Sequence, residues 1–100
     1  MSDADDAGGF AMPPFKPDDA LLQIQRGLRD LKLSPRGNGF ELRGKRVIEL
    51  DVDGPSITVK LARRLMMTPQ WDSLRLRSSA DQRRLIDEIK KRLARWDQED

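Results

Sequence analysis

The segment Phe40–Leu61 constrains the fold of this chain more than any other. Its apolar residues alternate with polar ones, as in strands with one buried face, and turn signals containing Gly interrupt it twice. Segments with helical spacing of apolar residues lie on either side. This order predicts a single α+β domain: a small antiparallel three- or four-stranded sheet, arranged as a meander, packed on one face by an N-terminal and a C-terminal helix.

The two helices are predicted from apolar spacing and from their end signals. The first is expected over residues 18–33, and Ser34-Pro35 ends it because the residue before proline avoids helical geometry. The last is the clearest element. Ser79 and Gln82 have the spacing of a capping box, and apolar residues follow at helical spacing as far as Trp96.

Two turn signals set the expected strand registers. The first hairpin is predicted to turn through the three-residue loop Gly44–Arg46, which places Phe40 opposite Leu50. The second is predicted at Asp53-Gly54, a dipeptide that favours two positive φ angles, and it places Leu50 opposite Ile57. Both registers keep the apolar side chains on one face.

Residues 62–72 leave two alternatives open. Arg63–Met67 could form a short helix, or the third strand could continue through it. Thr68-Pro69 has the pattern of a helix start, with Thr as the cap and Pro in the first turn. Beyond it, alternation over Ser73–Arg77 predicts an optional fourth strand.

Composition divides the chain into a flexible acidic arm with Pro and Gly over residues 1–16, one domain over 17–97 and a frayed acidic tail over 98–100. Residues 21–96 hold eighteen Lys and Arg against nine Asp and Glu. A basic body with acidic ends favours a negatively charged partner. Because no segment has the apolar length of a signal peptide or a bilayer span, we expect a soluble, cytoplasmic protein without a membrane partner.

Several kinds of chemistry are not expected. The chain has no Cys, His or Tyr, and so lacks a thiolate, the commonest base near neutral pH and the commonest neutral metal ligand. Glu49–Gly54 resembles the start of a calcium loop, but Lys60 stands where that loop needs a bidentate Glu. Gly37–Gly39 lies between a helix and a strand, the reverse of a nucleotide-binding loop. We therefore expect no enzyme, no metal and no cofactor.

The basic residues from Lys60 to Arg95 are the group of side chains for which the sequence suggests a function. They number eleven against four Asp and Glu, and such a surface can hold phosphates electrostatically. An alternative for the part on the last helix is a solvated face with ion pairs. The predicted nucleic-acid or anion-binding residues are Lys60, Arg63, Arg64, Arg75, Arg77, Arg84, Lys91 and Arg95.

A second hypothesis is protein–protein contact or homodimerisation, through a sheet edge or the arm. Phe10 and Phe15, like Met12, are apolar residues in an arm expected to be solvated. Trp96 is expected in the core or at its edge, with partial exposure beside the acidic tail as the alternative that would make it a contact residue. Phe10, Phe15 and Trp96 are the protein-contact candidates. We therefore expect a non-catalytic binding module, with nucleic acid or another polyanion as the first partner class and a protein as the alternative.

Over Asp18–Trp96 the order of helix, three strands and helix resembles the topology of double-stranded-RNA-binding domains. That family carries a Lys-rich start to its last helix, whereas this chain has Ser78–Gln82 there and inserts the extra segment Ala62–Arg77. Both departures fall where the family contacts RNA. The resemblance therefore implies a topology, and it does not transfer RNA-binding residues to this chain.

Overall fold

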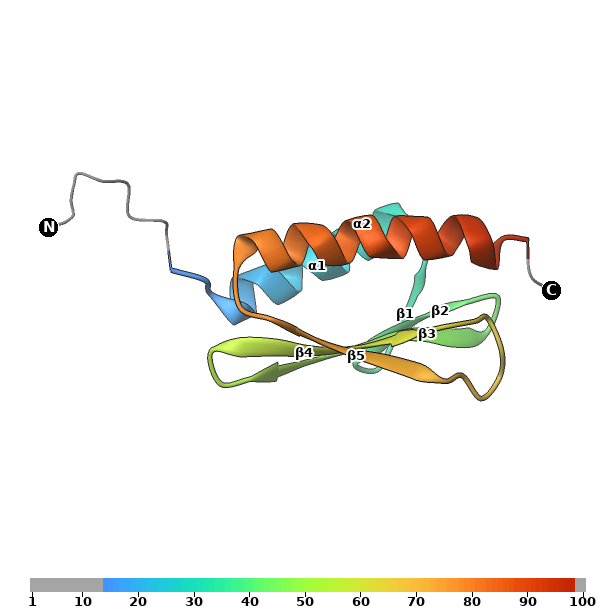
Figure 1. Ribbon diagram of the computed structural model, residues 1–100, viewed down its shortest axis with the longest axis horizontal. Helices are drawn as coiled ribbons and strands as arrows, with labels where there is room; N and C mark the ends of the chain where they lie inside the picture. The colour runs from blue at the N-terminus through green and yellow to red at the C-terminus, as the bar shows by residue number, and fades with distance from the viewer. Residues whose placement is uncertain (1–13, 99–100) are drawn as a thin grey trace, which may run out of the picture.

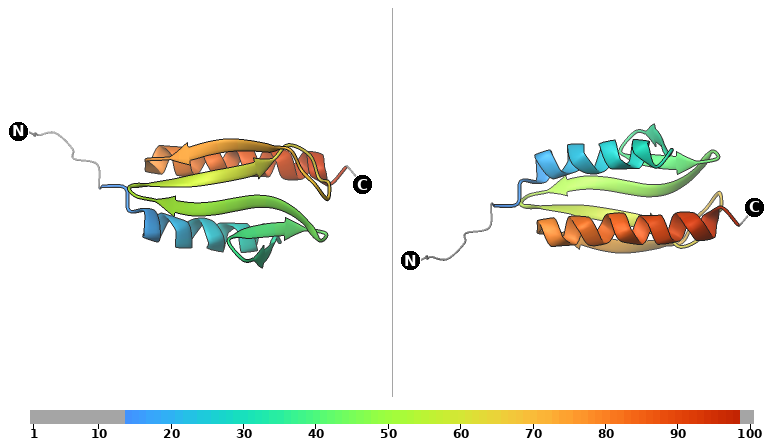
Figure 2. Two further views of the ribbon diagram at one scale, coloured as in Figure 1. Left: turned by 90° about the horizontal axis from the view of Figure 1, so that it is seen from below. Right: turned by 90° about the horizontal axis from the view of Figure 1, so that it is seen from above.

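The computed structural model describes residues 14–98. Its elements are α1 (Pro17–Asp30), β1 (Ser34–Arg36), β2 (Gly39–Leu42), β3 (Lys45–Asp53), β4 (Ser56–Ala62), β5 (Trp71–Leu76) and α2 (Ser79–Trp96). The strands form one antiparallel meander in chain order, and both helices lie on the same face of it (Figures 1 and 2). The predicted α+β class and helix arrangement are confirmed. The sheet has five strands, so the expectation of three or four is wrong.

The strand that the sequence did not predict is β1. α1 ends at Asp30, earlier than expected, and Lys32 redirects the chain with a φ of 71°. Ser34–Arg36 then returns as a short edge strand in which Pro35 lies opposite Phe40. Proline is tolerated there because an edge strand has a free side that needs no N–H donor.

The β2–β3 hairpin has a different register from the predicted one. Its turn contains two residues, Arg43 and Gly44, with φ angles of 55° and 78°. Two positive φ angles match the twist of the flanking strands. Phe40 consequently pairs with Ile48, and a bulge next to Glu41 absorbs the extra residue of β3.

The β3–β4 hairpin is also shifted. The turn lies at Gly54-Pro55, one residue later than predicted, so Leu50 pairs with Val59 and not with Ile57. Because the pairing moves by two residues, every side chain keeps the face that the sequence assigned to it.

Residues 63–70 form the β4–β5 loop and are neither helix nor strand. β4 ends at Ala62, and Thr68-Pro69 does not start a helix. The Arg63 N–H donates to the Gln70 carbonyl oxygen at 2.9 Å, which closes the base of the loop. The predicted optional strand is present as β5 and begins at Trp71.

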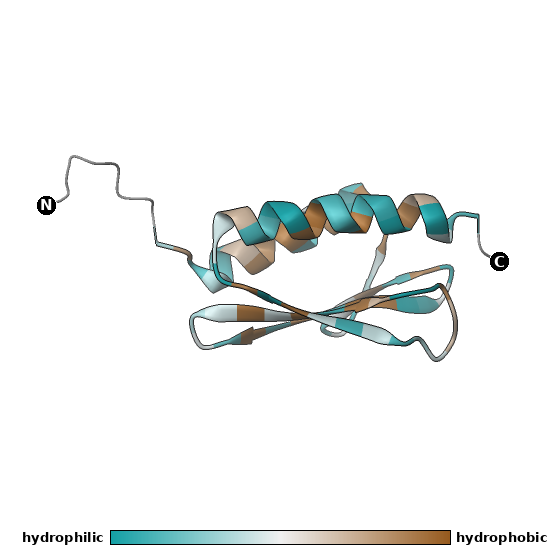
Figure 3. Ribbon diagram, in the orientation of Figure 1, coloured by the Kyte–Doolittle hydropathy of each residue, from teal (hydrophilic) through white to brown (hydrophobic). Residues whose placement is uncertain are grey.

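The core lies between the helices and the sheet. Apolar and polar residues alternate along the strands and around α2 (Figure 3). Along β3 and β4 the apolar members of this alternation are buried, as the sequence pattern predicted, except Val52 at the end of β3, which is exposed. The largest fully buried side chains include Ile24 and Leu28 of α1, Ile48, Ile57 and Leu61 of the sheet, and Leu85, Ile89 and Trp96 of α2.

The structure describes two of the protein-contact candidates. Trp96 is 0% exposed, because it shares the apolar face of α2 with Leu85 and Ile89. Its expected place in the core is confirmed, and the alternative of partial exposure is wrong. Phe15 is half-buried and packs against the core instead of extending into solvent. Phe10 lies outside the described residues. No helix within residues 14–98 is long and apolar enough to cross a membrane.

Candidate anion-binding site

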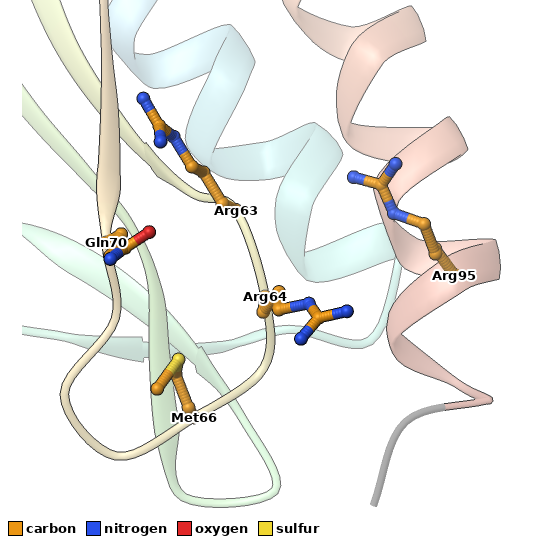
Figure 4. A pocket seen from close by; sticks show the side chains of 5 residues that line it. All are labelled: Arg63, Arg64, Met66, Gln70 and Arg95. Atoms are coloured by element: carbon orange, nitrogen blue, oxygen red, sulfur yellow. The ribbon is translucent and has the colours of Figure 1, made fainter.

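A hollow of about 450 Å³ opens between the β4–β5 loop and α2 (Figure 4). We call it the loop hollow. Arg64 of the loop and Arg95 of α2 both extend into the space between the loop and the helix (Figure 4). Its lining consists of Arg63, Arg64, Met66, Gln70 and Arg95, and none of these carries a negative charge.

Arg92 fixes α2 against the strands that carry the loop. Its side chain is only 13% exposed, and it donates to the carbonyl oxygens of Leu61 and Ala62 at 3.4 and 3.1 Å. The same guanidinium contacts Asp72 at 2.9 Å and Glu88 at 2.8 Å. One arginine therefore joins the end of β4, the start of β5 and a turn of α2.

Asp72 of β5 lies between two guanidinium groups. Arg63 donates to one carboxylate oxygen at 2.7 Å, and Arg92 approaches the other. The hydrogen bond from Arg63 is the main reason that the pKa of Asp72 lies below its ordinary value, and that from Arg92 adds to it. The hydrogen bond from Arg92 likewise lowers the pKa of Glu88. Both carboxylates are therefore ionised at neutral pH, and they compensate Arg63 and Arg92.

Arg64 and Arg95 differ from these two arginines. Both are exposed, and within residues 14–98 neither has a carboxylate partner. The side-chain amide of Gln70 also makes no hydrogen bond within that part of the chain. Two arginines that line one hollow without an ion pair of their own favour an anion there, and the guanidinium fork suits a phosphate or carboxylate.

Two of the other predicted residues contribute to a different cavity, which we call the β5 groove. It also measures about 450 Å³, lies between β5 and α2, and has Leu74, Leu76 and Leu85 in its apolar part. Every arginine that lines it has a carboxylate partner. These ion pairs are Arg75 with Asp53 at 3.2 Å, Arg84 with Asp81 at 3.2 Å, and Arg92 with Glu88 at 2.8 Å.

The remaining three predicted residues line neither cavity. Lys60 lies in β4 opposite Glu49, and Arg77 is exposed just after β5. Lys91 is exposed on α2, one helical turn before Arg95. Of the eight predicted basic residues, the structure therefore brings together Arg63, Arg64 and Arg95.

Two lining residues, Met66 and Gln70, were not predicted from the sequence. Met66 and its neighbour Met67 are 42% and 74% exposed, which is unusual for such apolar side chains. The sequence feature that could have indicated them is an adjacent pair of methionines close to two arginines, in a segment that fitted neither helix nor strand well. Such a segment is typical of a loop that a scaffold presents for binding.

Comparison of the chain with protein-family models, with curated proteins and with solved structures finds no match in any of the three. No relative therefore indicates a ligand for the loop hollow. Its chemistry has to be inferred from the side chains that line it and from the charges around them.

Proposed function

We propose that this chain is a non-catalytic binding module that holds phosphate groups of a nucleic acid or another polyanion in the loop hollow. The proposal rests on two arginines, Arg64 and Arg95, that line the same hollow and have no carboxylate partner within residues 14–98. Arg63 also lines the hollow, but its guanidinium is paired with Asp72 and points away from the other two (Figure 4). Charge-assisted, bidentate hydrogen bonds from arginine are among the strongest that a phosphate accepts.

The lining of the loop hollow supports binding rather than catalysis. Its ionisable residues are all arginines, which stay protonated in proteins and cannot act as general bases. Gln70 and Met66 exchange no proton near neutral pH and are weak nucleophiles. The site can therefore attract, orient and release an anion, but it offers no group that transfers a proton to one.

The test is a titration of a fluorescent oligonucleotide and of inorganic polyphosphate at low salt. The R64A/R95A variant should bind at least about tenfold more weakly, because a hydrogen bond to a charged group contributes about 1.5–3 kcal/mol. The matched control is R75A/R84A, which removes two arginines that are already paired and should change affinity by less than about twofold. Equal losses in the two variants would contradict the proposal.

The β5 edge favours a second function, contact with another protein. β5 has six residues and contains no Pro, and within residues 14–98 it pairs with β4 alone, so one side of its backbone is open in that part of the chain. Leu74 on this strand is 37% exposed and lines the β5 groove. The opposite edge, β1, has only three residues and contains Pro35. An open edge beside an apolar groove can accept an added strand.

Sedimentation velocity over a range of protein concentrations tests this second function. Self-association through β5 should weaken in a Leu74→Lys variant, because a charge on an edge strand opposes pairing. Leu22→Lys is the matched control, since Leu22 is an exposed leucine of α1 away from this edge. A strictly monomeric wild-type chain at high micromolar concentration would contradict homodimerisation.

A further inference from the structure

We infer that the loop hollow accepts one unpaired nucleotide of a single strand, with its phosphate between Arg64 and Arg95 and its base against Met66 and Gln70. The inference rests on the proposed function and narrows its ligand. It follows from three features: the small number of guanidinium groups that the hollow offers, the concave shape of the site, and the neutral part of its lining.

The first feature is the small number of guanidinium groups that the hollow offers to a phosphate. Proteins hold duplexes through many phosphate contacts along the backbone. The arginines of the neighbouring β5 groove that were predicted to bind anions, Arg75 and Arg84, are already paired with carboxylates. Arg64 and Arg95 can therefore reach one or two neighbouring phosphates within the hollow, and the groove beside it does not extend this pair.

The second feature is the concave shape of the site. Its volume of about 450 Å³ lies within the range of small-molecule pockets, roughly 300–1,000 Å³. A duplex keeps its bases stacked inside and presents a convex backbone, so it could offer this concavity only a phosphate. An unpaired nucleotide can bring its phosphate and its base into the same hollow.

The third feature is the neutral part of the lining. The amide of Gln70 offers both a donor and an acceptor, which is the pattern that glutamine uses to recognise the edge of an adenine. The hydrogen bond between Arg63 and the Gln70 carbonyl holds this residue at the base of the loop. Met66 exposes a polarisable thioether that can lie against the flat face of a base.

Fluorescence anisotropy of the full chain with labelled eight-nucleotide oligomers tests the inference. Single-stranded oligoadenylate should bind at least about tenfold more tightly than a duplex of the same length, because only the single strand can place a base in the hollow. The logarithm of affinity should fall with the logarithm of salt concentration with a slope of about −1.4 to −2, as two or three phosphate contacts to a single strand require.

A Gln70→Ala variant distinguishes the contribution of the base to binding from that of the phosphate. It should remove the preference for oligoadenylate over oligocytidylate and leave the salt slope unchanged, since Gln70 carries no charge. Gln25→Ala on α1 is the matched control and should preserve both properties, because Gln25 does not line the hollow.

The outcomes distinguish this inference from the proposed function. Equal or tighter binding of the duplex would overturn the inference and leave the proposed function intact. Binding of polyphosphate without binding of any oligonucleotide would do the same. If neither oligonucleotides nor polyphosphate bind, or if R64A/R95A binds them as the wild type does, both fail.

Discussion

The loop hollow and the β5 groove have equal volumes, and three arginines line each of them. In the β5 groove every guanidinium has a carboxylate partner. In the loop hollow, among the residues that the structure describes, Arg63 has one and Arg64 and Arg95 do not. The number of arginines therefore does not define an anion site. The deciding quantity is how many of those arginines lack a carboxylate partner.

The largest effect is expected from placing a carboxylate in the loop hollow. Met66→Glu would give Arg64 and Arg95 an internal partner and make the hollow resemble the β5 groove. Anion affinity should fall about 100-fold, which corresponds to about 2.7 kcal/mol of lost attraction and added repulsion. Anisotropy titration measures the loss. Met66→Gln, similar in size but uncharged, should stay close to wild type, and an equal loss in that variant would indicate a steric effect.

The next largest effect is on stability. It concerns Arg92, which lines the β5 groove and also holds α2 against the strands that carry the β4–β5 loop. Arg92→Met keeps the apolar stem but leaves the carbonyl oxygens of Leu61 and Ala62 without their donor. The free energy of unfolding should fall by about 1–3 kcal/mol. Urea unfolding followed by circular dichroism measures the change. Arg83→Met, at an exposed position of the same helix, should leave stability almost unchanged.

A smaller effect is expected from pH, through Asp72 and Glu88. Hydrogen bonds from arginines lower both pKa values in the folded state, so the unfolded chain binds more protons in acid. Their stabilisation is complete above the ordinary carboxyl pKa values and is lost as pH falls below roughly 4.5. Thermal unfolding between pH 3 and 7 should show this decline, and a D72N/E88Q variant should flatten it. An unchanged slope in that variant would contradict the role of the two carboxylates.

The smallest effect is expected from freeing an arginine in the β5 groove. Asp53→Asn removes the partner of Arg75, and because this pair is exposed, stability should change by less than about 0.5 kcal/mol. Anion affinity at low salt should rise by about twofold at most, since one exposed charge contributes little. A rise comparable to the loss in R64A/R95A would place the main anion site in the groove instead.

The alternation of apolar and polar residues predicted which face of each strand is buried, but not which residues pair across neighbouring strands. The alternation over Phe40–Leu61 assigned the buried face correctly, because side-chain direction depends only on the period of two. The registers depended on which residues adopt positive φ, and Arg43 is an uncommon choice for that conformation. β1 was missed because Ser34-Pro35 is a strong helix-ending signal that carries no sign of the edge strand it begins.

The site was harder to predict than the fold, for a spatial reason. Arg64 and Arg95 are thirty-one positions apart, and they line the same hollow because α2 runs back over the end of the sheet that carries the β4–β5 loop. Charge counting treated Arg75 and Arg84 as equivalent to them, since their pairing with Asp53 and Asp81 becomes visible only in three dimensions. For Trp96, by contrast, the helical spacing predicted the buried position correctly, and its closeness to the acidic terminus suggested an exposure that the structure does not have.

The two tryptophans give the chain two optical reporters in different surroundings. Trp71 is half-buried and directly follows Gln70, so its fluorescence should respond when a molecule occupies the neighbouring cavity. Trp96 is wholly enclosed, and its indole N–H has no hydrogen-bond acceptor within residues 14–98, so it should emit at short wavelength until the chain denatures. Occupancy and unfolding should therefore produce separable spectral changes without any added dye.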